Sequence, residues 1–140
     1  MKYKKINDKW FIILAKGEKV VEKLTEFCNK KDIKAGFFKA IGAINDVEMA
    51  HFDPLEKKYS YKKMSGALEI VSLMGNVTRK DNQIIIHSHI SVSAENMLVY
   101  GGHLKEAIVS VTCEIALVDL KTTVVRTLDK DSGLNLVDFS

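Results

Sequence analysis

The sequence has 140 residues, of which 46% are hydrophobic and 28% are charged, and its formal net charge at pH 7 is +3. This composition predicts a soluble globular protein with one domain over residues 1–140, and the longest apolar runs are far too short to span a membrane. A short apolar stretch follows the N-terminal lysines, but a charged "KGEK" stands where a cleavage site would lie, so we expect no export signal. Cys28 and Cys113 form no C-x-x-C pair, which indicates unreactive thiols in a reducing cytoplasm.

Positive charge is concentrated at the start of the chain. Residues 1–40 hold eleven lysines against five acidic residues, which leaves the remainder with a net negative charge. A lysine-rich face could attract polyanions, but lysines on a helix usually face solvent without a partner. Only Arg79 and Arg126 offer the guanidinium fork that reads bases in DNA. We therefore expect DNA binding to be weak and unspecific, or absent.

The first elements in chain order are a strand and a helix. Residues 10–15, "WFIILA", are typical of a strand that is buried on both faces. Residues 17–36 carry apolar residues at helical spacing, which predicts the principal helix. The apolar stripe of this helix consists of Val20, Val21, Leu24, Phe27 and Cys28. Glutamates near its start and lysines near its end suit the helix dipole.

The rest of the chain is predicted to form strands. Residues 37–53 predict a long bent strand with a bulge or kink at Gly42, and residues 58–64 predict an edge strand with several lysines. Further apolar or alternating runs cover residues 66–77, 84–93, 97–104, 107–120, 122–129 and 134–139. About seven strands, mostly joined as hairpins, and one principal helix near the N-terminus predict an α+β domain with a largely antiparallel sheet.

Three of the four histidines fall close together in the sequence. His87 and His89 are two residues apart in residues 84–93, so they share the less apolar face of the predicted strand, and two imidazoles at that spacing can bind one ion. His103 follows two glycines, which allow a close approach of the backbone. Three neutral imidazoles with an open position suit zinc or a similar divalent ion. The spacing leaves open that these are ordinary surface histidines. The isolated His51 is interpreted as a structural or a surface residue.

Glu114 is the other candidate, because it lies in the very apolar run of residues 107–120. It could orient a metal-bound histidine, or act as a general base near a bound water. A glutamate that simply faces solvent is an equally good interpretation. The sequence contains no phosphate-binding loop, dinucleotide-binding motif or serine-hydrolase motif.

The first alternative interpretation of the histidines is that they belong to the metal site of a cupin fold. The run "HSHISVSAENMLVYG", with Glu95 and Gly101, loosely matches the first cupin motif. The second motif needs a proline and a later histidine, but Pro54 is the only proline and no histidine follows His103. A helix at residues 18–31 also fits an all-β barrel poorly.

The ordered set "GALEIVSLMGNV", "HSHISVS", "YGGHL" and "VTCEIAL" resembles the plants-and-prokaryotes-conserved (PPC) domain, which accompanies AT-hooks in plant nuclear proteins and stands alone in prokaryotes. The resemblance runs from the first predicted strand to Leu120. It implies an α+β fold, assembly as a homotrimer, and zinc bound by His87, His89 and His103, while Glu114 matches an acidic position of the family. The family is called DNA-binding largely through the AT-hooks, and this sequence contains none.

Two classes of function follow from these observations. The first is a homotrimeric binding or regulatory module with a structural or ligand-sensing metal, whose partners are its own copies and a small-molecule ligand or a protein. The second is a metal-dependent enzyme that acts on a small molecule through a metal-bound water, with Glu114 as base. The absence of a substrate-specific motif favours the module.

Overall fold

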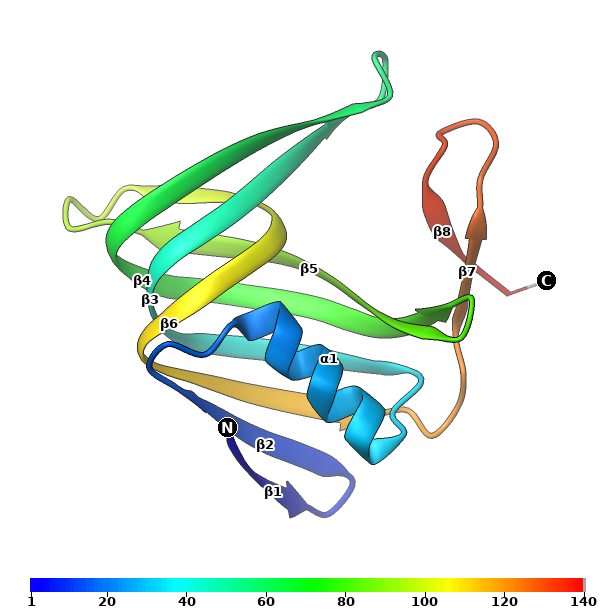
Figure 1. Ribbon diagram of the computed structural model, residues 1–140, viewed down its shortest axis with the longest axis horizontal. Helices are drawn as coiled ribbons and strands as arrows, with labels where there is room; N and C mark the ends of the chain where they lie inside the picture. Colours follow the sequence, from blue (N-terminus) through cyan, green and yellow to red (C-terminus); the bar gives the residue numbers. More distant parts are fainter. Residues whose placement is uncertain (140) are drawn as a thin grey trace.

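The chain folds in the order β1–β2–α1–β3–β4–β5–β6–β7–β8 in the computed structural model, which describes residues 1–139 (Figure 1). The bounds are β1 Lys2–Ile6, β2 Lys9–Ala15, α1 Val20–Lys31, β3 Gly36–Asp53, β4 Lys58–Lys80, β5 Gln83–Ser93, β6 Val99–Asp119, β7 Val125–Leu128 and β8 Asn135–Asp138. No helix within residues 1–139 is long and apolar enough to cross a membrane.

All eight strands belong to one sheet with the strand order β1-β2-β6-β3-β4-β7-β8, and β5 pairs with both β4 and β6. The four long strands β3, β4, β5 and β6 therefore pair in a closed circuit. All the strand pairings of the sheet are antiparallel except that of β4 with β7, where Arg79 and Val125 pair in parallel. The predicted α+β class with a largely antiparallel sheet is confirmed, with the correction that the sheet is mixed.

The helix α1 lies across the inner face of the sheet (Figure 1). Its stripe packs as predicted, because Val20, Leu24, Phe27 and Cys28 are buried in the same core cluster as Ile12 and Leu14 of β2. The helix ends where Asp32 turns into the left-handed conformation, with φ 53°.

One helix covers only one side of the sheet, so the prediction that residues 10–15 are buried on both faces is wrong. Ile12 and Leu14 are fully buried, whereas Phe11 and Ile13 on the opposite side are each 40% exposed. The neighbouring strands continue this exposed side with further large apolar residues. We call this surface the apolar outer face and define it by Phe11, Ile13, Phe37, Ile41, Val71 and Met74.

Two strand boundaries also differ from the prediction of about seven strands. Residues 58–64 and 66–77 are parts of one strand, β4, and residues 97–104 and 107–120 both fall largely within β6. The lysine-rich β1 was not predicted at all. The bend at Gly42 is confirmed, because the register of β3 shifts on both sides of it, and a Cβ there would lie 2.2 Å from the carbonyl oxygen of Thr112.

Candidate metal centre

Three histidine side chains converge where β5 pairs with β6. His89 and His103 are directly opposite each other in the register of these strands, and His87 is two residues along β5. One ring nitrogen from each of the three lies within 4.8 Å of the others. The ring centroids are 5.1 to 5.6 Å apart. Small rotations of these side chains would bring one nitrogen of each to about 2.0–2.1 Å from a common ion, which is the usual distance between zinc and a histidine nitrogen. The donor set therefore fits a divalent ion.

Local sequence accounts for the position of β5. Ile90 and Val92 are buried on one face of the strand, which turns the histidines to the other face. The two-residue turn before β5 consists of Asp81 and Asn82, which both have positive φ, 48° and 64°, as hairpin turns of the I′ type require. This turn sets the register that places β4 beside the histidines.

The two glycines before His103 bring β6 close to both of its neighbours. A Cβ at Gly101 would lie 2.9 Å from the carbonyl oxygen of Ile90, and one at Gly102 would lie 3.0 Å from that of Ala50. Real Cβ atoms rarely come this close to a carbonyl oxygen. A larger residue at Gly101 would push β6 away from β5, and one at Gly102 would push it away from β3, so His103 would move in either case.

Sequence reasoning missed Arg126 on β7, which lies against the cluster. One of its terminal nitrogens, Nη2, is 3.1 Å from Nδ1 of His87. The same guanidinium donates to the side chains of Thr78 and Asn76 and to the backbone carbonyl of Asn135. Its only signal in the sequence is that it is one of two arginines, since nothing local connects it to a histidine 39 residues earlier.

The surroundings of the cluster lower the pKa of two of its imidazoles, those of His87 and His103. Burial, followed by the charges of Arg126, His103 and His89, lowers the pKa of His87 to about 4. Burial also lowers the pKa of His103, with smaller contributions from His89, Lys105 and Arg126. His87 and His103 are therefore neutral at pH 7, which is the protonation state that a metal ligand needs.

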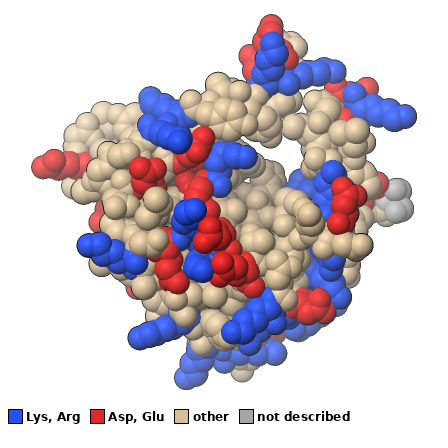
Figure 2. Space-filling model, in the orientation of Figure 1, with Lys and Arg blue, Asp and Glu red and all other residues tan. Residues whose placement is uncertain are grey.

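A pocket of about 460 Å³ opens beside His87 and His103. Its wall includes Tyr59, whose ring centroid is 5.9 Å from that of His103, and also Arg126 and Lys80. Figure 2 shows this region of the surface hollowed between the β3–β4 hairpin and the β7–β8 hairpin. The cluster is thus accessible to a small molecule from this side.

Glu114 lies outside the histidine cluster. It is exposed and lines a different pocket, of about 340 Å³, on the apolar outer face. The register places Ala116, two residues further along β6, in a cross-strand row with Lys39, Met74 and His89. Three strand spacings separate Ala116 from His89 in this row, which is about 14 Å. The cluster found in residues 1–139 contains only the three histidines, and His51 is an exposed residue outside it, as predicted.

The fold and the cluster together define a class of one-helix, single-sheet proteins with a three-histidine centre. The family model of the Plants and Prokaryotes Conserved (PCC) domain matches residues 1–121. The chain therefore belongs to this family, which is the PPC family that its histidine and glycine motifs resemble.

Solved structures of related proteins share the fold over nearly the whole chain. A proposed DNA-binding protein from Bacteroides thetaiotaomicron is 33% identical with a TM-score of 0.96, and the match covers 99% of this chain and 96% of that one. A metal-containing protein from Archaeoglobus fulgidus is 32% identical with a TM-score of 0.89, covering 99% of this chain and 100% of that one. A PPC protein from Pyrococcus horikoshii is 29% identical with a TM-score of 0.88, covering 99% and 94%. No protein of curated function matches the chain.

Proposed function

We propose that this protein is a homotrimeric binding module that holds one divalent metal ion, zinc, per chain through His87, His89 and His103. The observation that carries the proposal is the convergence of three imidazole nitrogens within 4.8 Å of one another. The metal-containing relative from Archaeoglobus fulgidus supports a metal in this fold. The ion would fix the junction of β5 and β6 and would keep an open position toward the adjacent pocket.

The apolar outer face supports the assembly into a trimer. Phe37, Ile41 and Met74 are 58%, 59% and 63% exposed, and a surface of this kind usually marks an interface. A second copy of this chain would cover this surface, because it is a sheet face with exposed apolar side chains from β2, β3 and β4. His89 is opposite Met74 in the register, so this interface would run beside the metal centre.

The enzyme alternative needs a base near the metal. Within one chain, two intervening strands, β3 and β4, separate Glu114 from His87 and His89, and Glu114 is eleven residues beyond His103 along β6. A role as base would therefore require Glu114 to come from a neighbouring subunit. The module needs no such group, and its ligand would be a small molecule or a protein bound at the pocket. The free, buried thiols suit a reducing cytoplasm.

The experiment is to measure the metal content of the purified protein and of three variants. We expect about one zinc per chain in the wild type, and a large loss in His87→Ala and in His103→Ala, because two imidazoles seldom retain zinc. His51→Ala is the matched control and should keep the wild-type content. Unchanged occupancy in both ligand variants would contradict the assignment.

A further inference from the structure

Arg126 is held in place by three partners other than His87. Its Nε donates to Oγ1 of Thr78 at 2.9 Å, Nη1 donates to the carbonyl of Asn135 at 2.9 Å, and Nη2 donates to Oδ1 of Asn76 at 3.1 Å. These contacts would remain if the contact with His87 were lost. The guanidinium is therefore a fixed positive group at the edge of the histidine cluster.

His87 can bind a metal only if its hydrogen bond from Arg126 is lost. A guanidinium has only donors, so Nδ1 of His87 must accept the hydrogen bond and the ring proton is on Nε2. A metal needs a nitrogen with a free lone pair. If Nδ1 binds the metal, it stops accepting from Arg126, and if the proton moves to Nδ1, two donors face each other. In either case one N–H of the guanidinium loses its acceptor.

Among residues 1–139, no acidic side chain lines the pocket that could accept the free N–H of Arg126 and offset its positive charge. Arg126 and Lys80 both line it, and no aspartate or glutamate of residues 1–139 does. A divalent ion on the histidines would add two positive charges close to the guanidinium. A positive ion bound to His87 and the positive guanidinium next to that ring would repel each other strongly in a partly buried site. An anion between the metal and Arg126 would offset both charges and would accept the free N–H.

We propose that the pocket is a joint site in which the metal ion and an oxyanion group of a small molecule, a carboxylate or a phosphate, strengthen each other's binding. The inference rests on the proposed metal site. The remaining walls of the pocket include Ile85, Leu134 and Leu136, which suit an apolar body behind the charged group. A pocket of about 460 Å³ is in the range that binds small molecules. Arg126 lies beyond residues 1–121, which the family model matches.

The test is a zinc titration by competition with a chromogenic chelator at pH 7.5 and constant ionic strength. It is run without added oxyanion, with acetate, and with methylphosphonate, so that the two arms separate carboxylate from phosphate recognition. We expect at least one of them to tighten zinc binding about five-fold or more, the lower end of common coupling between sites. By reciprocity, the zinc-loaded protein should bind that anion more tightly than the metal-free protein does.

Variants at Arg126 test whether the coupling between zinc binding and anion binding depends on this residue. In Arg126→Ala the anions should no longer tighten zinc binding, and zinc binding without anions should be as tight as in the wild type or tighter, because the repulsion is gone. Arg126→Gln keeps an amide donor near the position of Nε, which donates to Thr78, without the charge, and it should also lose the coupling, which separates this effect from misfolding. Arg79→Ala removes the other arginine and should keep the wild-type response.

The outcomes separate the two proposals. Zinc affinity that is the same with and without both anions, or an unchanged anion effect in both Arg126 variants, would overturn the joint site and leave the metal site standing. A wild-type protein that binds no zinc in any arm would overturn the metal assignment and the joint site together.

Discussion

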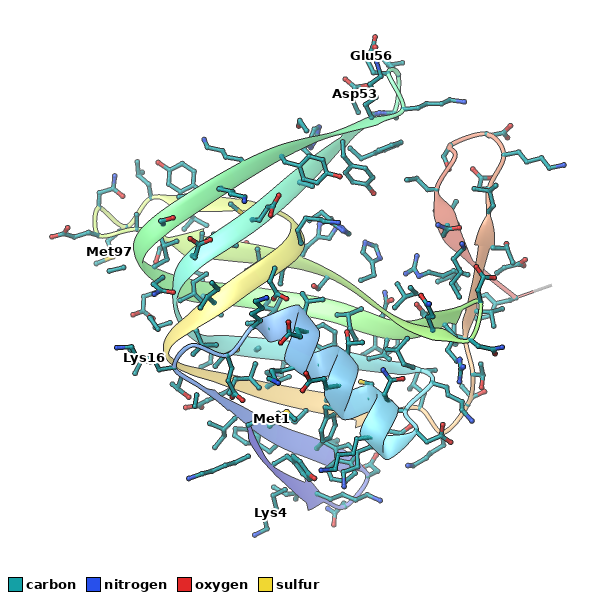
Figure 3. The ribbon with its side chains drawn as sticks, in the orientation of Figure 1. Met1, Lys4, Lys16, Asp53, Glu56 and Met97 are labelled. Atoms are coloured by element: carbon teal, nitrogen blue, oxygen red, sulfur yellow. The ribbon has the colours of Figure 1, made fainter. Side chains whose placement is uncertain are left out.

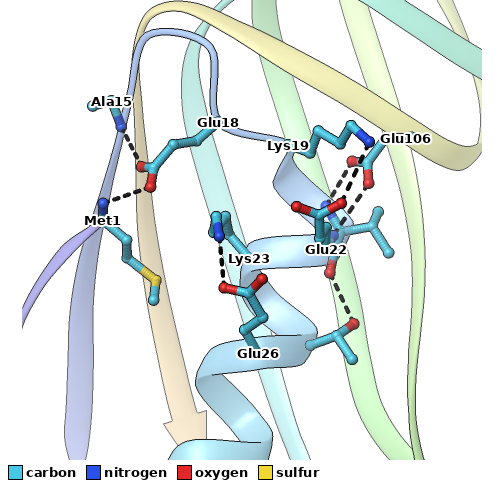
Figure 4. Close-up of polar contacts among 10 residues, drawn as sticks. Met1, Ala15, Glu18, Lys19, Glu22, Lys23, Glu26 and Glu106 are labelled. Carbon is cyan, nitrogen blue, oxygen red and sulfur yellow. Dashed lines mark hydrogen bonds and ion pairs between the residues drawn. The ribbon is translucent and has the colours of Figure 1, made fainter.

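Glu106 on β6 accepts hydrogen bonds from the backbone amides of Val21 and Glu22, in the first turn of α1 (Figure 4). The residue at the N-cap position, Lys19, makes no side-chain hydrogen bond to the helix. A carboxylate from a distant strand thus does the work of a capping side chain and also complements the helix dipole. The helix is thereby tied to the strand that carries His103, three residues away.

Replacing Glu106 should destabilise the protein. We expect Glu106→Ala to lower the free energy of unfolding by about 1–2 kcal/mol, as for loss of a helix cap, and Glu106→Gln to cost less because one oxygen remains. Urea denaturation measures the difference. Glu56, at the exposed tip of the β3–β4 hairpin next to Asp53, gives a matched control, and Glu56→Ala should behave as the wild type (Figure 3). Equal stability of all four proteins would show that Glu106 caps nothing.

The apolar outer face can be tested through the assembly. Light scattering at micromolar concentration should give three times the 15.7 kDa mass of one chain. The double variant Phe37→Glu, Ile41→Glu places two charges on that face and should give monomers, because charges are costly in an interface core. Leu55 is 91% exposed at the hairpin tip, so Leu55→Glu is the control and should stay trimeric. A wild type that runs as a monomer would refute the trimer.

The metal-free protein should lose stability as the pH falls because of His87. Its pKa in the folded protein is about 4, against about 6.5 for a free histidine, so between these values the unfolded chain binds the proton that the folded chain excludes. Stability therefore decreases from pH 6.5 toward 4, by on the order of 1 kcal/mol, because the ring is only partly buried.

Melting temperatures at pH 7.5 and 4.5, with a chelator present, measure this loss. The His87→Gln variant should lose less stability between the two pH values than the wild type does. His51→Gln should follow the wild type, because this exposed residue lies outside the cluster. Identical losses in the wild type and His87→Gln would contradict the assignment.

The two thiols should not react in the native protein. Cys28 and Cys113 are fully buried, and burial raises the pKa of each to about 12. Thiol reagents attack the thiolate, so labelling with a chromogenic disulfide at pH 8 should be negligible until guanidinium unfolds the chain. A Leu55→Cys variant gives an exposed thiol as a positive control. Fast labelling of the native wild type would show that one of the two sites opens.

DNA binding should be weak, unspecific and sensitive to salt. On the face that carries α1, basic and acidic residues are interspersed (Figure 2). Both partners of the pairs Lys19–Glu22 and Lys23–Glu26 lie on or beside this helix, which removes part of the positive potential of the N-terminal region. Titration of labelled duplexes of different sequence at about 50 and 200 mM salt tests this. Tight binding to one sequence at the higher salt would instead support a sequence-specific role.

The sequence predicts those parts of the structure that depend on short-range patterns. The helical spacing from Val20 to Cys28 predicts α1, and the alternation around His87 and His89 predicts the face on which they lie. It fails for β1, whose single partly buried side chain, Tyr3, packs edge-on against Trp10 and Phe27. A strand with one partly buried side chain has too little periodicity to be recognised, and its position depends on its neighbours.

The candidate site divides in the same way. The spacing of the histidines and the glycines before His103 are local features, so the three-histidine cluster was within reach of the sequence. Arg126 was not, because its position depends on how β7 and β8 return to the edge of β4. Nor could the sequence show that two strands separate Glu114 from His87 and His89, since that depends on the order of strands in the sheet.

The closed circuit of long strands has a consequence for the way the chain reaches its native state. Trp10, near the N-terminus, pairs with Leu117, near the C-terminus, and β3 also pairs with β6. Contacts this far apart in sequence require the closure of long loops before they become stabilising, which slows folding. During synthesis, β2 can pair with β1, but its other edge has no native partner until β6 has been synthesised. Because β6 also carries His103, the step that completes the core is the step that completes the histidine cluster, and a chain arrested before it would hold only the pair on β5.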